Sequence, residues 1–281
     1  MIAKILRSLP DFKGKRRLVK FLFKNKVQSG SNIPVSGKFG IKYLLPNLRE
    51  SISLDIFTNG VYEEDTHRFL ISQIKENGVF LDLGANIGSI SIPLIKRRPD
   101  IKCFCVEAAP WIFEFLQKNI SLNLPDGSIT CINRALMDKD AESVPFYSPS
   151  EQFGKGSLAP VFTQEAVMVK SLTIDSLVTQ HGLSNVDFIK MDIEGFEYFA
   201  FKGAELLLKN EDAPVILFEF VDWAEENAGL TKGRAQQLLL DYGYRLFVLT
   251  AENKWLNLPK PLTNGSEMIF ATKRSFNSLQ E

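Results

Sequence analysis

The stretch that decides the fold is Phe80-Leu81-Asp82-Leu83-Gly84-Ala85-Asn86-Ile87-Gly88. The apolar run at 79–83 predicts a buried strand, and the helical pattern at 88–97 predicts that a helix follows at once. Gly84 and Gly88 would let the backbone of the turn approach a ligand closely. Ligands of open α/β sheets bind beyond the carboxyl ends of the strands. The stretch therefore predicts a ligand site at the first strand-to-helix turn of such a sheet.

Outward from this stretch, short apolar runs alternate with helical patterns, which predicts βαβ units and a parallel sheet. The strands are expected at 79–83, 101–106, 129–133, 186–191 and 215–220, with last strands at 245–250 and 268–271. The helices between them are expected at 88–97, 111–122, 196–209 and 234–242. The interruption at 140–175 holds two apolar runs around a Gly/Ser/Pro loop and predicts a β-hairpin insertion near the ligand cleft. The fold class is thus α/β, doubly wound and Rossmann-like.

The chain of 281 residues suits one enlarged α/β domain or two smaller ones. We expect a basic N-terminal arm and linker at 1–37 and a cap of short strands and turns with a helix from Glu64 at 38–78. The main domain is expected at 79–272 and a tail at 273–281.

Charge and cysteine content narrow the functional classes. Lys and Arg number 33 and Asp and Glu also number 33, so global charge makes no case for nucleic-acid binding. Three cysteines are few and odd in number, which suits a reducing compartment. No apolar stretch is long enough to span a membrane, and no secretory signal is expected. The sequence therefore predicts a cytoplasmic protein.

The exception to this balance is the segment 1–26, which holds nine basic residues and the single acid Asp11. A basic, partly apolar arm can lie on an anionic membrane surface, which would make the protein membrane-peripheral. A solvated tail, or a helix packed on the main domain, explains the same pattern. Both explanations stay open at this point, and the oligomeric state is not predicted.

The glycine loop is not the dinucleotide fingerprint Gly-x-Gly-x-x-Gly, which disfavours an NAD-dependent oxidoreductase. It is Gly-x-x-x-Gly with Asp82 two residues before Gly84. A carboxylate there suits a ligand that carries a cation and has no pyrophosphate. S-adenosylmethionine carries an ammonium and a sulfonium and no phosphate. A tight turn capped by Asn86 is the structural alternative.

Glu107 ends the next predicted strand, 19 residues after Gly88. An acid about 20 residues past a glycine loop can accept hydrogen bonds from ribose hydroxyls. One adenosyl ligand would explain both Asp82 and Glu107, although each acid by itself could be a solvated strand end.

A third group of acids follows the strand at 186–191. Asp192 and Glu194 lie in the turn before a helix, and Glu219 lies near the end of the following strand. Carboxylates gathered at a cleft are costly unless they meet a cation, a metal ion or a proton. A sulfonium, a substrate hydroxyl to be deprotonated or Mg²⁺ would each fit, with Asp192 and Glu219 as the metal ligands. Glu197 is expected to be a charge on the surface of the helix.

Between residues 62 and 220 the chain resembles the FkbM-type methyltransferases, a branch of the class I S-adenosylmethionine-dependent enzymes. The matching pieces are 80–88, Glu107 with Pro110, 135–138, 171–175, 188–197, 202–204 and 214–219. Their order and spacing together are far more specific than any one of them.

This resemblance implies a sheet of about seven strands whose last strand is antiparallel. It implies cofactor contacts from Asp82, Gly84, Asn86, Gly88 and Glu107, with Ala135 beside the adenine and Asn133 assisting. The implied activity is O-methylation of a hydroxyl on a sugar, glycan or secondary metabolite. Asp192 is then the first candidate for the base, with Glu194 and Glu219 as partners. A non-catalytic binding module that retains the fold is the alternative.

Overall fold

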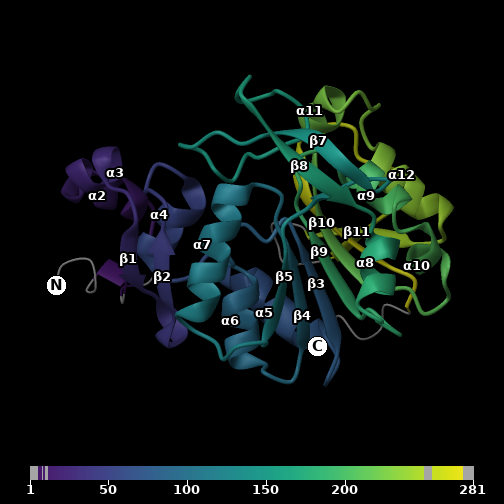
Figure 1. The fold of residues 1–281 in the computed structure, drawn as a ribbon, viewed down its shortest axis with the longest axis horizontal. Helices are drawn as coiled ribbons and strands as arrows, with labels where there is room; N and C mark the ends of the chain where they lie inside the picture. Colours follow the sequence, from purple (N-terminus) through teal and green to yellow (C-terminus); the bar gives the residue numbers. More distant parts are fainter. Residues whose placement is uncertain (1–5, 8, 10–11, 250–254, 275–281) are drawn as a thin grey trace.

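The computed structural model describes residues 6–7, 9, 12–249 and 255–274, and its centre is an eight-stranded sheet (Figure 1). The strand order is β12-β11-β13-β10-β9-β3-β4-β5. The parallel strands predicted from the sequence are β3 (Val79–Leu83), β4 (Lys102–Val106), β5 (Ile129–Ile132), β9 (Phe188–Met191) and β10 (Val215–Val221). Their apolar runs are continuous because both faces of the sheet are buried.

The C-terminal strands complete the sheet. The last strand, β13 (Ser266–Thr272), runs antiparallel between β10 and β11 (Arg245–Leu249), which confirms the expected antiparallel last strand. An eighth strand, β12 (Trp255–Leu258), pairs with β11 at the edge and was not predicted from the sequence. A half-exposed edge strand of four residues carries too short a pattern to stand out.

Helices cover both faces of the sheet, as expected for a doubly wound fold. One face packs against α5 (Glu64–Gln73), α6 (Ser91–Arg97) and α7 (Pro110–Ser121). The other packs against α8 (Ile174–Gln180), α9 (Glu197–Lys202), α10 (Glu205–Lys209) and α12 (Arg234–Asp241). Successive residues of a strand alternate between these two cores, so Phe80 and Leu81 lie in different apolar clusters.

The helix expected at 196–209 is instead two short helices, α9 and α10. A Cβ at Gly203, where α9 ends, would lie 2.2 Å from the carbonyl oxygen of Met137. The backbone of the interruption therefore packs directly on the segment after β6.

The predicted hairpin insertion is present. Strands β7 (Ala141–Tyr147) and β8 (Ala166–Leu172) pair antiparallel, and β6 (Ala135–Leu136) adds to β8 to make a three-stranded sheet. The long loop between β7 and β8 lies near the carboxyl ends of the central strands, and α11 (Asp222–Asn227) follows β10 at the same end (Figure 1).

The N-terminal part forms helices α2 (Lys15–Leu22) and α3 (Lys24–Ser29), then strands β1 (Ile33–Ser36) and β2 (Lys42–Leu45) with η1 (Lys38–Gly40) between them. The expectation of an arm and linker at 1–37 is wrong near its end, where residues 33–36 form β1. The expectation of strands and turns alone up to residue 60 is also wrong, because α4 (Ser51–Asn59) is a helix. Every residue from 52 to 58 is buried, so α4 has no polar face to reveal its helical period. No described helix is both long and apolar enough to cross a membrane.

Candidate active site

The predicted turn after β3 is shaped by the neighbouring strand. Gly84 has a φ of 84°, and a Cβ there would lie 1.9 Å from the carbonyl oxygen of Asp192. Only glycine allows this approach, so the β3 and β9 turns lie against each other. Gly84 and Asn86 line a cavity at this end of the sheet. Gly88 is not among the residues that line the cavity and packs instead toward Ile92 and Leu116.

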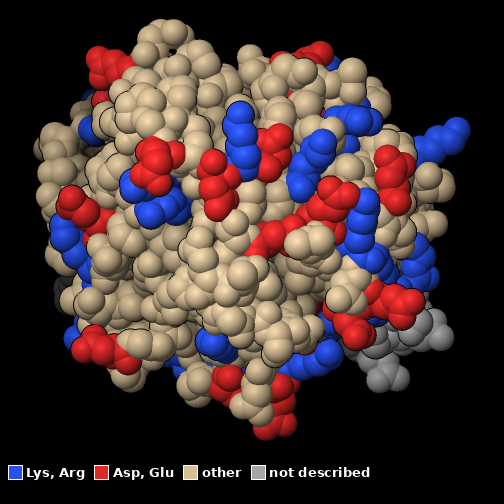
Figure 2. Space-filling model, turned by 45° about the vertical axis from the view of Figure 1, so that its right-hand side comes forward, with Lys and Arg blue, Asp and Glu red and all other residues tan. Residues whose placement is uncertain are grey.

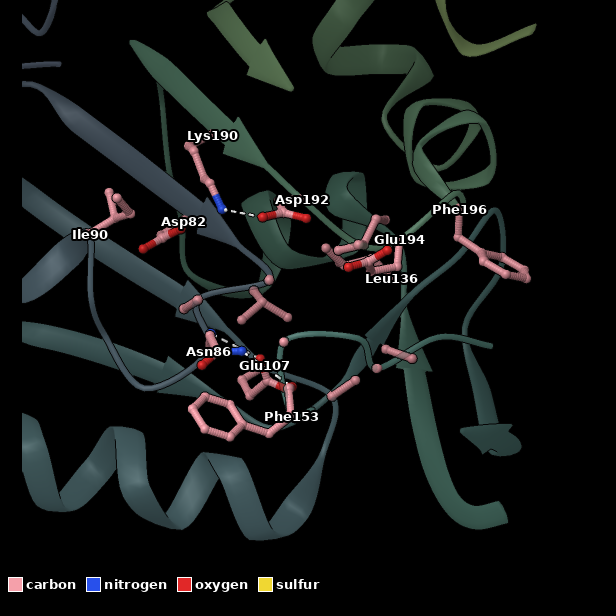
Figure 3. Close-up of a pocket in the computed structure, with 18 of the residues that line it drawn as sticks. Asp82, Asn86, Ile90, Glu107, Leu136, Phe153, Lys190, Asp192, Glu194 and Phe196 are labelled. Carbon is pink, nitrogen blue, oxygen red and sulfur yellow. Dashed lines mark hydrogen bonds and ion pairs between the residues drawn. The ribbon is translucent and has the colours of Figure 1, made fainter. Parts of the chain in front are cut away.

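Glu107 connects the first two turns of the sheet. Its carboxylate accepts hydrogen bonds from the backbone N–H of Asn86 (2.9 Å) and of Ala109 (2.8 Å), and it lines the cavity (Figure 3). Burial raises the pKa of Glu107 to about 7, although these donors oppose the shift. Each carboxylate oxygen keeps a lone pair, so Glu107 can also accept from a ligand hydroxyl.

Asp82 lies at the buried end of the same cavity. The Ser91 hydroxyl donates to its Oδ2, while Oδ1 has no hydrogen-bond partner in the structure. Burial raises the pKa of Asp82, and the Lys190 ammonium opposes the shift. An unpaired, fully buried carboxylate oxygen suits a cationic ligand group.

Lys190 is a site residue that the sequence reasoning missed. It lies on β9, is 5% exposed, and its Nζ is 3.3 Å from Oδ2 of Asp192 (Figure 3). Burial lowers the pKa of Lys190, but Asp192, Asp82 and Glu63 outweigh that effect and raise it overall. Lys190 therefore stays charged and offsets the acids around it. The available signal was a lysine between apolar residues of a buried strand, immediately before an acidic turn.

The three candidate catalytic acids lie together. Asp192 and Glu194 line the cavity, whereas Glu219 is a neighbour outside its lining. Burial, Asp192 and Glu219 raise the pKa of Glu194 to about 9. Burial and Asp192 raise the pKa of Glu219 to about 7, with Lys190 opposing. At neutral pH this group therefore holds at least one proton.

Glu197 is not the surface charge expected from the sequence. It is 3% exposed, and its Oε1 accepts a hydrogen bond from the backbone N–H of Ile193 at 3.0 Å. Burial raises its pKa to about 8. Glu197 therefore holds the shape of the turn that carries Glu194.

The structure gives Mg²⁺ no support. Among the described residues, no three or more His, Cys, Asp or Glu side chains are grouped so that they could hold a metal ion. The positive charge beside Asp192 is the Lys190 ammonium. The expected metal ligands Asp192 and Glu219 therefore do not form such a site.

The remaining residues predicted to contact the cofactor, Asn133 and Ala135, lie after β5 and in β6. Ala135 lines the cavity together with Arg134 and Leu136. Asn133 does not line it, because its side-chain amide donates to the carbonyl oxygens of Glu107 (2.8 Å) and Ala108 (3.1 Å). Asn133 thus fixes the backbone around Glu107.

The loop after β7 covers the cavity. Phe153 is 2% exposed, and its carbonyl oxygen accepts a hydrogen bond from the Asn86 side chain at 3.4 Å (Figure 3). The Gly154 N–H donates to Glu50 of the N-terminal cap, and the Ser157 hydroxyl donates to the carbonyl oxygen of Glu194. The loop is therefore held on both sides of the cavity by hydrogen bonds. The Gly/Ser/Pro composition of the loop did not predict these contacts.

An aromatic pair lies near the acids. Phe162 of the loop packs edge-on against Trp223 of α11, with ring centroids 5.4 Å apart, and the Lys155 ammonium lies 4.7 Å from the Phe162 ring centroid. Trp223 is 38% exposed. A Cβ at Gly195 would lie 2.5 Å from the carbonyl group of Ala224, so α11 packs closely on the acidic turn.

Taken together, the cavity has acids and an ammonium at one end and apolar residues such as Phe153, Leu158 and Phe196 around it. Such a site can bind a ligand with both cationic and apolar parts. It can also take a proton from a hydroxyl group placed beside Asp192.

Two solved structures show low similarity to this chain. P. horikoshii TYW2 in complex with MeSAdo is 15% identical, with a TM-score of 0.45, over 92% of this chain and 84% of that one. Aeropyrum pernix fibrillarin in complex with S-adenosyl-L-methionine is 15% identical, with a TM-score of 0.41, over 74% of each chain.

Sequence comparison gives a more specific result. The methyltransferase sdnD of Sordaria araneosa is 24% identical over 54% of this chain and 67% of its own length. The hexuronic acid methyltransferase AglP of Haloferax volcanii is 25% identical over 55% of this chain and 61% of its own length. A model of the methyltransferase FkbM domain matches residues 82–246, which is more than half of the 281 residues. The chain belongs to the FkbM methyltransferase family.

Proposed function

We propose that this protein transfers a methyl group from S-adenosylmethionine to a hydroxyl oxygen of a sugar or glycan. The observation that carries the proposal is that Asp82, at the end of β3, and Glu107, after β4, border one cavity. An adenosyl ligand with a cationic end would engage both, because Glu107 can accept from its ribose and the free Oδ1 of Asp82 suits its ammonium.

The residues of β6 and of the covering loop would hold the adenine. Ala135 and Leu136 provide an apolar wall, and Phe153 excludes water above it. When bound, S-adenosylmethionine would supply an electrophilic methyl group on its sulfonium.

The acids after β9 would then act on the acceptor. Asp192 would take the proton of an acceptor hydroxyl placed beside it, and the oxygen so activated would receive the methyl group that a bound S-adenosylmethionine would supply. The Lys190 ammonium pairs with Asp192 at 3.3 Å, and Glu219 lies beside Asp192, where it would share the proton. The alignment of oxygen, methyl and sulfur is mainly a positioning task, which a rigid cavity can perform.

Two observations support a sugar as the acceptor. AglP is a hexuronic acid methyltransferase by name, and it matches just over half of this chain. The exposed face of Trp223, beside the acidic turn, offers a flat apolar surface for the C–H face of a sugar ring.

The test is calorimetric titration with S-adenosylhomocysteine on the wild type, Glu107→Ala and Glu114→Ala. Glu114 is 68% exposed on α7 and is the matched control. We expect micromolar binding that only Glu107→Ala weakens, by about tenfold or more, equivalent to about 1.4 kcal/mol. A screen of sugars and glycans by mass spectrometry, with and without Mg²⁺, then identifies the acceptor.

A folded wild-type protein that binds no S-adenosylhomocysteine would contradict the proposal. The non-catalytic binding module would then be the better explanation of the fold.

A further inference from the structure

The outer side of α2 carries large apolar side chains with no core to cover them. Leu18, Phe21 and Leu22 are 39%, 79% and 48% exposed. Their spacing of three and four residues places them on one side of the helix. The inner side of α2 packs on the protein. Val19 is completely buried, and Arg16 forms an ion pair with Asp55 of α4 at 2.9 Å. The exposed apolar row is therefore held in a fixed direction by the packing of α2 on α4.

A row of positive charges lies beside the apolar row. Arg17 and Lys20 are exposed, and at 100° per residue they follow Phe21 around the surface of α2; Lys24, exposed at the start of α3, adds a third positive charge next along the chain. No Asp or Glu occurs in the sequence between Asp11 and Glu50. On the face of the molecule drawn in Figure 2, by contrast, acidic and basic side chains are interspersed.

The charges indicate which partner this surface fits. A second copy of the chain would bring two basic rows together, and like charges repel. A nucleic acid would satisfy the charges but leave the Phe21 side of the helix in water. An anionic bilayer satisfies both rows, because its headgroups carry negative charge and its acyl boundary accepts apolar side chains.

The position of the helix agrees with this partner. Figure 1 shows α2 and α3 at the outer edge of the molecule, beyond α4. A helix of eight residues is too short to cross a bilayer but long enough to lie on one. The site cavity is lined by other elements, so docking through α2 would leave it open to ligands.

We propose that α2 docks the protein on an anionic membrane surface. Leu18, Phe21 and Leu22 enter the headgroup–acyl boundary, and Arg17, Lys20 and Lys24 contact the negatively charged lipid headgroups. This inference does not depend on the proposed methyl transfer.

The test is co-sedimentation of the full chain with vesicles of phosphatidylcholine alone or mixed with phosphatidylglycerol. We expect binding to the mixed vesicles only, and weaker binding as salt is added. Two variants remove one row each: Phe21→Ala with Leu22→Ala, and Arg17→Glu with Lys20→Glu and Lys24→Glu. Each is expected to lower the partition coefficient by about tenfold or more.

Matched controls change similar residues elsewhere. Leu206→Ala removes a side chain that is 80% exposed on α10, close to the exposure of Phe21. Lys118→Glu, Lys139→Glu and Lys209→Glu together make the same charge change on other surfaces. Both controls should bind vesicles as the wild type does, and all variants should keep the wild-type melting temperature and S-adenosylhomocysteine affinity.

Three results would overturn the proposal. The first is a wild-type chain that does not bind the mixed vesicles, or apolar-row variants that bind them equally well. The second is a wild-type dimer, seen by light scattering, that Phe21→Ala dissociates while vesicle binding is absent, which would make this a self-association surface. The third is binding that depends on the basic row alone and is displaced by single-stranded RNA, which would identify a polyanion site.

Discussion

The Nζ of Lys190 lies 3.3 Å from Oδ2 of Asp192, inside a sheet whose neighbouring strand carries the buried Asp82. One lysine thus lies between an acid of the neighbouring strand β3 and an acid of the turn after β9. Its ammonium opposes the rise in the pKa of Asp82 that burial causes.

Lys190→Met should destabilise the protein and weaken cofactor binding, because Asp82 and Asp192 lose their shared cation. Breaking a buried charge pair costs about 3–5 kcal/mol, and the partial exposure of Asp192 places the expected loss near the lower end. Urea unfolding measures it. Lys170→Met is the control, since Lys170 pairs with Glu142 on the surface and should change stability by about 0.5 kcal/mol or less. Equal stability of the two variants would show that Lys190 does not neutralise the acids.

Gly84→Ala should disrupt the turn, because its Cβ would meet the Asp192 carbonyl oxygen. Gly127→Ala is a matched comparison, with a φ of 81° and no heavy atom within 4 Å of the added Cβ. Both substitutions carry the left-handed backbone cost of about 1–2 kcal/mol. Only Gly84→Ala should add a further loss of stability and abolish S-adenosylhomocysteine binding, as thermal unfolding and calorimetry would show. Similar losses in both variants would mean that the close approach costs nothing.

Stability should fall as pH rises in the ligand-free protein. The pKa of Glu194 is raised to about 9, so the folded state holds a proton that the unfolded state releases near the ordinary glutamate pKa. The free energy of unfolding therefore decreases from about pH 5 up to about pH 9. Glu194→Gln should make this decrease shallower. Urea unfolding at each pH should show that the free energy of unfolding of the variant exceeds that of the wild type most near pH 9.

Glu165→Gln, on the exposed loop before β8, serves as the control for that titration. A wild-type curve that rises with pH over this interval would refute the protonated Glu194. In Glu194→Gln, stability should still fall somewhat with pH, because burial also raises the pKa values of Glu107, Glu197 and Glu219.

Asp192→Asn should slow methyl transfer, because an amide cannot accept the acceptor's proton. General-base catalysis contributes about 10²–10⁴-fold, so kcat should fall by at least about 10²-fold. The affinity for S-adenosylhomocysteine, measured on the same protein, should change far less than kcat. A kcat equal to that of the wild type would remove Asp192 from the role of base.

Trp223→Ala should weaken acceptor binding and leave the cofactor site intact. If the stacking contact contributes about 1.4 kcal/mol to acceptor binding, its loss raises the KM for the acceptor about tenfold. Leu256→Ala, at a side chain 55% exposed on β12, is the control. An unchanged KM with the Trp223 variant would place the acceptor elsewhere.

Much of this architecture could be predicted from the sequence. The apolar runs of β3, β4, β9 and β10 stand out because central parallel strands are buried on both faces. The order of the glycine loop, Glu107 and the acidic turn was enough to indicate the family. Glu107 and Asp192 were singled out because polar residues directly after buried strands point to a cleft, and Asp82 because it lies two residues before Gly84.

The errors have a common physical origin. Helix α4 is buried all round, β12 is a short edge strand, and Glu197 is an acid that packing has enclosed. In each case the residue pattern reflects contacts with segments distant in sequence, which local periodicity does not report.

The sequence by itself determined the fold class, the family and the turns from which the site is built, since these depend on periodicity and on motifs that are local in the chain. Only the tertiary structure decided how those turns meet. It placed Lys190 between two acids, turned Asn133 toward the backbone of Glu107, and fastened the loop with Phe153 over the cavity. Those relationships depend on the pairing of strands far apart in sequence, and on the burial and neighbouring charges that follow from it, which together shift the pKa values of these groups.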